Sequence, residues 1–389
     1  MQFLIPKEPR LHWAMIYPKR RDWAVFPSFF GKPTYFFFWA RNAIYHGLSA
    51  MEVSPGDTIL VPSFHCAMAI EPILRYGANV KFYNIHRDCS PDFEDLCRKI
   101  DKKTRAVLAI HYFGFPCPIK TFKKVCEEHA LYLIEDCAHV LSGGIEGDPL
   151  GTFGDISIFS WRKLLPIYDG GHLVINNPKL HIDVPWERSG LLLNLKVAKN
   201  LVEKLLDSSS TRSSKTLLQY CRFPNVLKKD CFFLGKDSSR AFTINNSSLD
   251  FDPSFVNLRI SVISKYLMAN MNISAIIEKR RQNYVLLLKA VDSFPEITPF
   301  FPHLSSDTCP WIFPLIMQGQ KGFHTILRSK GIPAVTWDGV IHPNLPLEEY
   351  PEAAFLYQNL IFLPVHQSIG EREIGTLIEI IKTVFLHGD

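Results

Sequence analysis

An acid, a histidine, a serine and a lysine lie within one stretch of the chain: Asp136, His139, Ser160 and Lys163. The first two follow one short apolar run and the last two follow the next, and such runs are typical of buried strands. Ligands of open α/β sheets bind at the carboxyl ends of the strands. The spacing therefore predicts one site that contains all four side chains.

These residue types suit an aldehyde cofactor such as pyridoxal 5′-phosphate (PLP). A lysine amine forms a Schiff base with an aldehyde, and a carboxylate keeps a pyridine nitrogen protonated. Lys163, next to Arg162 in an apolar segment, is the candidate amine, and its pKa is expected to be lowered. Asp136 is the candidate partner of the ring nitrogen, and His139 is a candidate contact of the phenolic oxygen. Simpler interpretations are a solvated loop lysine, a helix N-cap and a hydrogen-bonded core histidine, respectively.

Two other segments are candidates for binding the phosphate and covering the ring of such a cofactor. Arg41 and Asn42 lie where a helix is expected to begin, and the free amides of a helix N-terminus bind anions. The Ser160 hydroxyl is a further donor to the same phosphate. His65 and Cys66 follow an expected strand and are candidates to lie against the ring, although core packing would also explain them.

Composition restricts the class of protein. The chain has 389 residues, 47% hydrophobic and 21% charged, which is typical of a globular protein with one large core and a second, smaller domain. Its first residues include prolines and charges where a signal peptide needs an apolar core, and no apolar run approaches the roughly 20 residues of a membrane span. Nine cysteines without a Cys-x-x-Cys pair suggest reduced thiols, and the histidines show no metal-binding spacing. We expect a cytoplasmic protein without a metal site.

The positive charge is concentrated in one segment. The net charge is +5, and residues 178–240 contain 12 lysines and arginines against six acidic residues. A general nucleic-acid binder would have a broad basic face, so this class is disfavoured. The segment suits an anionic ligand or partner. Its amphipathic part, Ser189–Leu206, would also allow docking on an anionic membrane surface, although packing within the protein is the more common use of such a helix.

Short β-rich runs alternate with helix-length segments from about residue 40 to residue 177, which predicts a three-layer α/β domain with a mostly parallel sheet. The expected strands are Thr58–Pro62, Val80–Asn84, Ala106–Ile110, Leu131–Glu135, Ile156–Phe159 and His172–Ile175. The expected helices between them are Ala43–Met51, Cys66–Tyr76, Pro91–Ile100 and Ile119–His129.

The remainder of the chain predicts a second domain. Residues 1–252 would form the large domain, with a helical insert at about 178–252 that contains a Ser/Thr-rich patch at 208–214. Residues 253–389 would form a long helix, at about 259–291, and a small α+β domain with a strand segment in Thr308–Met317 and a closing helix near Glu371–Phe385.

In their order and spacing, several motifs resemble the DegT/StrS-type sugar aminotransferases, which are fold type I PLP enzymes. The resemblance runs over nearly the whole chain. It rests on PGDTILVPSF (Pro55–Phe64), KIDKKTRAVLAIHYFGFP (Lys99–Pro116), IEDCAH (Ile134–His139), GTFGDISIFS (Gly151–Ser160), the lysine–Gly-Gly segment, FVNLRIS (Phe255–Ser261) and FLPVH (Phe362–His366).

The resemblance implies a role for each matching residue. Lys163 would form the Schiff base with PLP and then move the proton between the substrate Cα and the cofactor C4′. Asp136 would hold the pyridinium, and His139 would lie beside the ring hydroxyl.

For the phosphate, the resemblance implies Ser160 with the amides of Arg41 and Asn42. Asn257 would reach the phosphate of a neighbouring subunit, which makes an active homodimer with shared sites, and Arg259 would contact an anionic substrate group.

The sequence departs from the family pattern at five places. Lys163 lies only three residues after Ser160, about two fewer than usual, although its spacing to Gly170-Gly171 is normal. Arg41-Asn42 replaces a small Gly-Thr pair. Cys66, with His65 beside it, replaces the aromatic residue that stacks on the ring. The N-terminal segment also lacks the substrate-gating helix and loop of the family, and the insert at 178–252 is longer than usual.

These observations predict a PLP-dependent aminotransferase that moves an amino group from glutamate or glutamine to a keto group of a nucleotide-linked sugar or related polyol. One alternative is a binding or regulatory subunit that kept the fold and lost turnover. Another is a PLP-dependent sugar dehydratase of the same family, which the lysine at position 163 disfavours because those enzymes have a histidine there.

Overall fold

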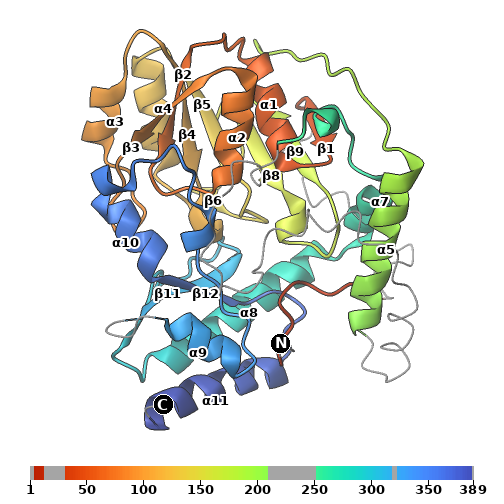
Figure 1. The fold of residues 1–389 in the computed structure, drawn as a ribbon, viewed down its shortest axis with the longest axis vertical. Coiled ribbons are helices and arrows are strands. Elements are labelled where there is room, and N and C mark those ends of the chain that lie inside the picture. Colours follow the sequence, from red (N-terminus) through yellow and green to blue (C-terminus); the bar gives the residue numbers. More distant parts are fainter. Residues whose placement is uncertain (1–3, 13–30, 209–250, 318–321, 388–389) are drawn as a thin grey trace.

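A computed structural model describes residues 4–12, 31–208, 251–317 and 322–387 (Figure 1). Most of the basic insert and its Ser/Thr-rich patch lie outside these ranges, and so do residues 1–3 and 13–30. Within the described residues, no helix combines the length and the apolar character that crossing a membrane requires.

A seven-stranded sheet forms the core of the larger part of the molecule. Its strands, in spatial order, are β1 (Thr34–Phe37), β9 (Gly171–Ile175), β8 (Ile156–Ser160), β5 (Tyr132–Cys137), β4 (Thr104–Ile110), β2 (Thr58–Pro62) and β3 (Asn79–Tyr83). Only β9 runs antiparallel to its neighbours, β1 and β8. Every residue of β2, β8 and β9 is buried, because helices cover the sheet.

Four helices connect these strands: α1 (Ala40–Ala50), α2 (Ala67–Tyr76), α3 (Phe93–Lys99) and α4 (Ile119–Glu128). Helix α1 packs against α2, β8 and β9, whereas α4 packs against β4 and β5. The arrangement confirms the predicted α/β fold class with its mostly parallel sheet. The predicted strand Thr58–Pro62 has the bounds of β2, and the other predicted strands differ from the observed ones by one or two residues at their ends.

The predicted long helix at 259–291 is wrong in one respect, since the structure has two helices there. Helix α7 (Val262–Asn270) ends before Asn272, and α8 (Ile273–Val291) begins after it. The Asn272 side chain accepts a hydrogen bond from the Ala275 amide at 3.0 Å and so caps α8. Such local bonding by asparagine competes with a continuous helix, which explains the break.

The C-terminal part has a three-stranded antiparallel sheet in the order β10 (Ile297–Pro299), β11 (Ile312–Met317), β12 (Leu360–Pro364). Helix α8 packs on this sheet and on α11 (Glu371–His387), and the other two helices are α9 (Phe323–Ser329) and α10 (Pro351–Asn359). This combination is the α+β arrangement expected from the sequence. The domain boundary near residue 252 stays a prediction. In the insert, the bounds of α5 (Leu191–Ser208) differ by two residues at each end from those of the predicted helix, Ser189–Leu206. Figure 1 shows α5 on the same side of the molecule as α7.

Gly171, the first residue of β9, has to be a glycine because of the chain that passes beside it. A Cβ atom there would lie 2.2 Å from the carbonyl carbon of Trp39 and 2.4 Å from the nitrogen of Ala40. The preceding Gly170 donates to the Phe38 carbonyl at 3.0 Å. The Gly-Gly pair therefore holds the beginning of α1 tightly against the start of β9.

Glu135 is a buried carboxylate that ties β5 to the segment leading into β8. It accepts hydrogen bonds from the amides of Gly151, Phe153 and Gly154, from the Ser157 hydroxyl, and from His111 Nε2 at 3.0 Å. His111, Glu135 and Cys137 offer three potential metal ligands within 4.8 Å of one another. The carboxylate oxygens are already used by these five donors, so we interpret the trio as part of a hydrogen-bond network.

The substitution Glu135→Gln should destabilise the protein by about 2 to 4 kcal/mol, because an amide group would face N–H donors inside the core. Burial alone would raise the pKa of Glu135, but His111 and the Gly154 and Gly151 amides lower it. A lowered pKa gives stability that is present above the unfolded-state value and lost as the pH falls through the folded-state value. The destabilisation caused by Glu135→Gln should therefore be full at pH 7 and become smaller below about pH 4.

Urea unfolding at several pH values measures this difference, with the exposed Glu127→Gln as the matched control. An equal effect of the two substitutions at pH 7 would refute the role given to Glu135.

Candidate active site

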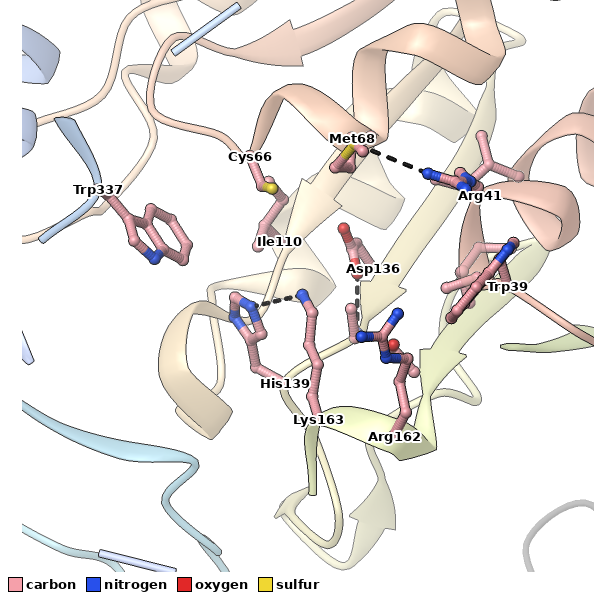
Figure 2. Close-up of a pocket in the computed structure, with 16 residues that line it drawn as sticks. Trp39, Arg41, Cys66, Met68, Ile110, Asp136, His139, Arg162, Lys163 and Trp337 are labelled. Atoms are coloured by element: carbon pink, nitrogen blue, oxygen red, sulfur yellow. Dashed lines mark hydrogen bonds between the residues drawn. The ribbon is translucent and has the colours of Figure 1, made fainter. Parts of the chain in front are cut away.

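A cavity opens at the carboxyl ends of β4, β5 and β8, where the sheet is expected to bind ligands (Figure 2). It has a volume of about 770 Å³, its open mouth included. Its polar lining consists of Arg41, Asp136, His139, Ser160, Arg162 and Lys163. Its apolar lining includes Trp39, Ile44, Cys66, Met68, Ile110, Ala138 and Trp337. Six of the predicted site residues thus meet in one cavity.

Lys163 is placed by a short 3-10 turn, Trp161–Lys163, that follows β8 directly. Its Nζ atom lies 3.0 Å from His139 Nε2. The Phe113 amide donates to His139 Nδ1 at 3.3 Å, so a neutral imidazole carries its proton on Nε2. That proton is donated to a neutral lysine amine, whereas an ammonium group would present N–H against N–H. The geometry therefore favours the neutral form of Lys163.

Electrostatics favours the same protonation states. Burial lowers the pKa of Lys163, and the charge of Arg162 lowers it further, while Asp136 acts in the opposite direction. Burial holds the pKa of His139 well below its ordinary value, and a positive charge on Lys163 would lower that pKa further. A neutral amine is the nucleophilic form, so the site supports covalent chemistry at Lys163 Nζ.

The backbone around Lys163 is held by residues of the C-terminal part. Trp311 Nε1 donates to the Lys163 carbonyl at 3.1 Å. The next carbonyl, that of Leu164, accepts from Arg280 Nη2 at 2.9 Å and from Gln367 Nε2 at 3.0 Å. Arg280 is fully buried and also donates to the carbonyls of Pro310 and Trp311. These bonds fix the turn from the side opposite to the sheet.

Asp136 lies in β5 with 8% of its surface exposed. Its Oδ1 accepts from the Ala138 amide at 2.8 Å. Burial raises the pKa of Asp136, and the charge of Lys163 and the Ala138 amide oppose the rise. A protonated nitrogen on a ligand would also lower the pKa of Asp136 and so favour its ionised carboxylate form.

Four predicted site residues do not line this cavity. His65 is fully buried, stacks on Phe82 with 5.1 Å between ring centroids, and has its Nδ1 atom 2.9 Å from the Pro62 carbonyl. Cys66, and not His65, therefore faces the space where a ring would lie.

Asn42 points to the other side of α1. Its side chain donates to the Phe255 carbonyl at 2.6 Å, and its amide donates to the Trp39 carbonyl at 3.1 Å. Asn257 Nδ2 donates a hydrogen bond to Glu187 Oε1 at 3.4 Å. The Arg259 Cζ atom lies 4.5 Å from the centre of the Trp186 ring. The roles of Asn42, Asn257 and Arg259 in binding stay predictions, because none of them reaches the cavity of its own chain.

Trp39, Arg162 and Trp337 are among the lining residues that sequence reasoning did not assign to the site. Trp39 and Arg162 are direct neighbours of predicted residues, so their positions gave a local signal. Trp337 comes from the C-terminal part, and its ring centroid lies 5.7 Å from that of His139. No local sequence pattern around Trp337 indicates that it reaches the cavity.

A second cavity of about 950 Å³ shares Arg162 and Lys163 with the first. Its other lining residues with charged or imidazole side chains are Lys7, Glu8, Lys204, Arg280 and His366. Lys204 forms an ion pair with Glu8 at 3.6 Å. The lining contains more cations than carboxylates, which favours anionic ligands beside Lys163.

A family of known proteins matches the part of the chain that contains this site. Residues 40–186 match the DegT/DnrJ/EryC1/StrS aminotransferase family. This match confirms the resemblance inferred from the motifs, and it contains Asp136, His139, Ser160 and Lys163.

Curated relatives match part of the chain. The chain is 38% identical over 144 residues to a GDP-perosamine synthase of Vibrio cholerae, which is 36% of this chain and 39% of that protein. It is 26% identical over 221 residues to the UDP-4-amino-4,6-dideoxy-N-acetyl-beta-L-altrosamine transaminase of Helicobacter pylori, which is 56% of this chain and 57% of that protein. The match thus spans between about two fifths and three fifths of these relatives.

Solved structures resemble the chain over almost its full length. Helicobacter pylori PseC, an aminotransferase involved in the biosynthesis of pseudoaminic acid, has a TM-score of 0.67 at 19% identity, covering 99% of this chain and 100% of that one. The PLP form of a putative sugar aminotransferase from Streptococcus pneumoniae, Spr1654, has a TM-score of 0.67 at 17% identity, covering 98% of each chain. At these identities the likeness establishes the fold.

The lowered pKa of Lys163 can be tested by competitive labelling with an amine-reactive reagent over a range of pH. In the cofactor-free protein, Lys163 should reach half-maximal labelling at a lower pH than the exposed Lys102. The variant Asp136→Asn should lower the Lys163 midpoint further, because it removes the negative charge that favours the ammonium form. A Lys163 midpoint at or above that of Lys102 would contradict the neutral amine.

Proposed function

We propose that the protein is a PLP-dependent aminotransferase that moves an amino group from glutamate or glutamine to a keto group of a nucleotide-linked sugar or related polyol. The observation that carries this proposal is the position of the Lys163 amine, 3.0 Å from His139 Nε2 and beside the buried Asp136. The family match over residues 40–186 supports the same activity.

The donor set of the cavity fits PLP. Asp136 provides a carboxylate for a protonated ring nitrogen, and Lys163 provides the amine for the aldehyde. Ser160 and Arg41 provide donors for a phosphate at the beginning of α1. Cys66, Met68, Ile110 and Ala138 line the same cavity as an apolar wall that suits a flat aromatic ring.

When bound, PLP supplies an electrophilic aldehyde and a ring that accepts electrons. Lys163 Nζ, kept neutral by burial and by His139, would provide the amine that holds the aldehyde, and it would take and return a proton. Asp136 would hold the charged ring nitrogen. The apolar wall and Trp337 would limit the contact of the ring with water, which would strengthen these electrostatic interactions.

The second cavity supports anionic substrates. Lys7, Lys204 and Arg280 lie around a space that adjoins Lys163, and Glu8 is the one carboxylate among the charged residues that line it in the described part of the chain. The carboxylates of glutamate and the diphosphate of a nucleotide-linked sugar carry the complementary charge. The matching relatives are named for GDP-, dTDP- and UDP-linked sugars, which supports the same substrate class.

We also propose a homodimer with shared active sites in the cytoplasm. Exposed apolar side chains on α5 and α7, including Leu191, Leu195 and Val262, favour contact with another surface. Seven described cysteines are free thiols, as expected in a reducing compartment. Light scattering that gives the mass of one chain would contradict the dimer.

Borohydride reduction of the protein isolated with PLP should leave a pyridoxyl group on Lys163, as mapped by peptide mass spectrometry. The variant Lys163→Ala should show no such adduct, whereas the exposed control Lys102→Ala should retain it on Lys163. A pyridoxyl group on another residue of the wild-type chain would refute the assignment of the amine.

Mixing the PLP-loaded protein with glutamate should convert the cofactor to its amine form in a single turnover, followed by absorbance. Asp136→Asn should slow this conversion by about 100-fold or more, because the charged ring nitrogen loses its partner. A wild-type protein that binds PLP at Lys163 but converts none of it with glutamate or glutamine would favour the binding or regulatory alternative.

A further inference from the structure

We propose that the guanidinium groups of Arg41 and Arg162, held over the ring of Trp39, form the binding site for the phosphate of the cofactor. The inference rests on the proposed use of PLP and assigns a role to Arg162, which the sequence motifs leave without one. It also changes the role of Arg41 from a backbone donor to a side-chain donor.

Both guanidinium groups lie against the same indole. The Arg162 Cζ atom lies 4.5 Å from the centre of the Trp39 ring, and the Arg41 Cζ atom lies 5.4 Å from it. Figure 2 shows these three residues on one side of the cavity, across Asp136 from His139 and Trp337. Stacking on an aromatic ring fixes the plane of a guanidinium group, whose N–H groups then bind an anion edge-on. Arg41 Nη1 also donates to Met68 Sδ at 4.0 Å, and a thioether is a weaker acceptor than a phosphate oxygen.

Trp39 is itself held firmly. It is 7% exposed, and its ring lies 4.7 Å from that of Phe38 and 5.9 Å from that of Tyr168. The close approach of Gly171 fixes its backbone. The two arginines therefore stand on a rigid support at the beginning of α1, beside Ser160.

The charges of the cavity call for an anion at this place. The two guanidinium groups of Arg41 and Arg162 line it beside the Lys163 amine, and among the described residues Asp136 is the one carboxylate that does. No carboxylate of the described chain forms an ion pair with Arg162. A phosphate dianion compensates two positive charges, and arginine binds it through two parallel N–H bonds.

The backbone at the beginning of α1 offers less to a phosphate than the family pattern does. The Asn42 amide already donates to the Trp39 carbonyl, and the small Gly-Thr pair expected there is replaced by Arg41-Asn42. Side-chain donors thus replace the backbone amides that bind the phosphate in the family pattern.

Arg162 also lines the second cavity, so a rival role is to bind an anionic substrate there. The two roles predict different results with pyridoxal, which has the ring and aldehyde of PLP but no phosphate. A phosphate-binding arginine affects PLP alone, whereas a substrate-binding arginine affects neither cofactor form.

The experiment measures dissociation constants of PLP and pyridoxal by absorbance titration of the cofactor-free full-length protein. Arg162→Gln and Arg41→Gln should each weaken PLP by about 10- to 100-fold and leave pyridoxal unchanged. Arg162→Lys, which keeps the charge but not the paired N–H edges, should give an intermediate loss. The matched control is Arg105→Gln, because Arg105 also lies over an aromatic ring, 4.9 Å from the centre of Tyr132, but outside the cavity.

Inorganic phosphate should compete with PLP in the wild type and more weakly in the two arginine variants. Equal weakening of PLP and pyridoxal in Arg162→Gln would show a structural role and overturn the inference, as would unchanged affinity for both with a raised KM for glutamate. A wild-type protein that binds pyridoxal at Lys163 as tightly as PLP would also overturn it, while leaving the proposed activity intact. A wild-type protein that binds neither compound would overturn the proposed function itself.

Discussion

The hydrogen bond between Lys163 Nζ and His139 Nε2 fixes where the reactive amine lies and which protonation state it favours. It exists because the Phe113 amide occupies the other ring nitrogen and leaves the proton on Nε2. A lysine that is exposed at pH 7 is an ammonium ion, which is not a nucleophile. Inside this cavity, burial and a neutral histidine remove that obstacle, and Asp136 can remain nearby as the partner of a ligand cation.

Two parts of the chain combine to build this arrangement. The sheet places Asp136 and Ser160 at neighbouring strand ends, and the turn after β8 brings Lys163 back over them. The C-terminal part then holds that turn through Trp311 and Arg280, which donate to the carbonyls of Lys163 and Leu164. Because the turn is held from both sides, a change in how the two parts pack would move the amine directly.

Much of this could be predicted from the sequence, because the signals are local. The apolar runs of the sheet, the acid at the end of β5 and the serine and lysine after β8 all follow from spacing along the chain. Where a nearby side chain competes with the pattern, prediction failed: Asn272 caps α8 and divides a helix whose apolar spacing continues through it.

Other features could not be predicted because they depend on contacts between distant residues. Whether His65 or Cys66 faces the ring is decided by how β2 ends against β3, where His65 stacks on Phe82. Trp337 reaches the cavity from the C-terminal part, about two hundred residues away from His139 in the chain. The stack of Arg41 and Arg162 on Trp39 joins the beginning of α1 to the turn after β8, where Gly171 lets the two backbone segments approach closely.

The most direct measurement of the central claim is a crystal structure of the protein grown with PLP. The account predicts continuous electron density from Lys163 Nζ to the cofactor, with the ring nitrogen at the Asp136 carboxylate, and density elsewhere or an empty cavity at saturating PLP would contradict it.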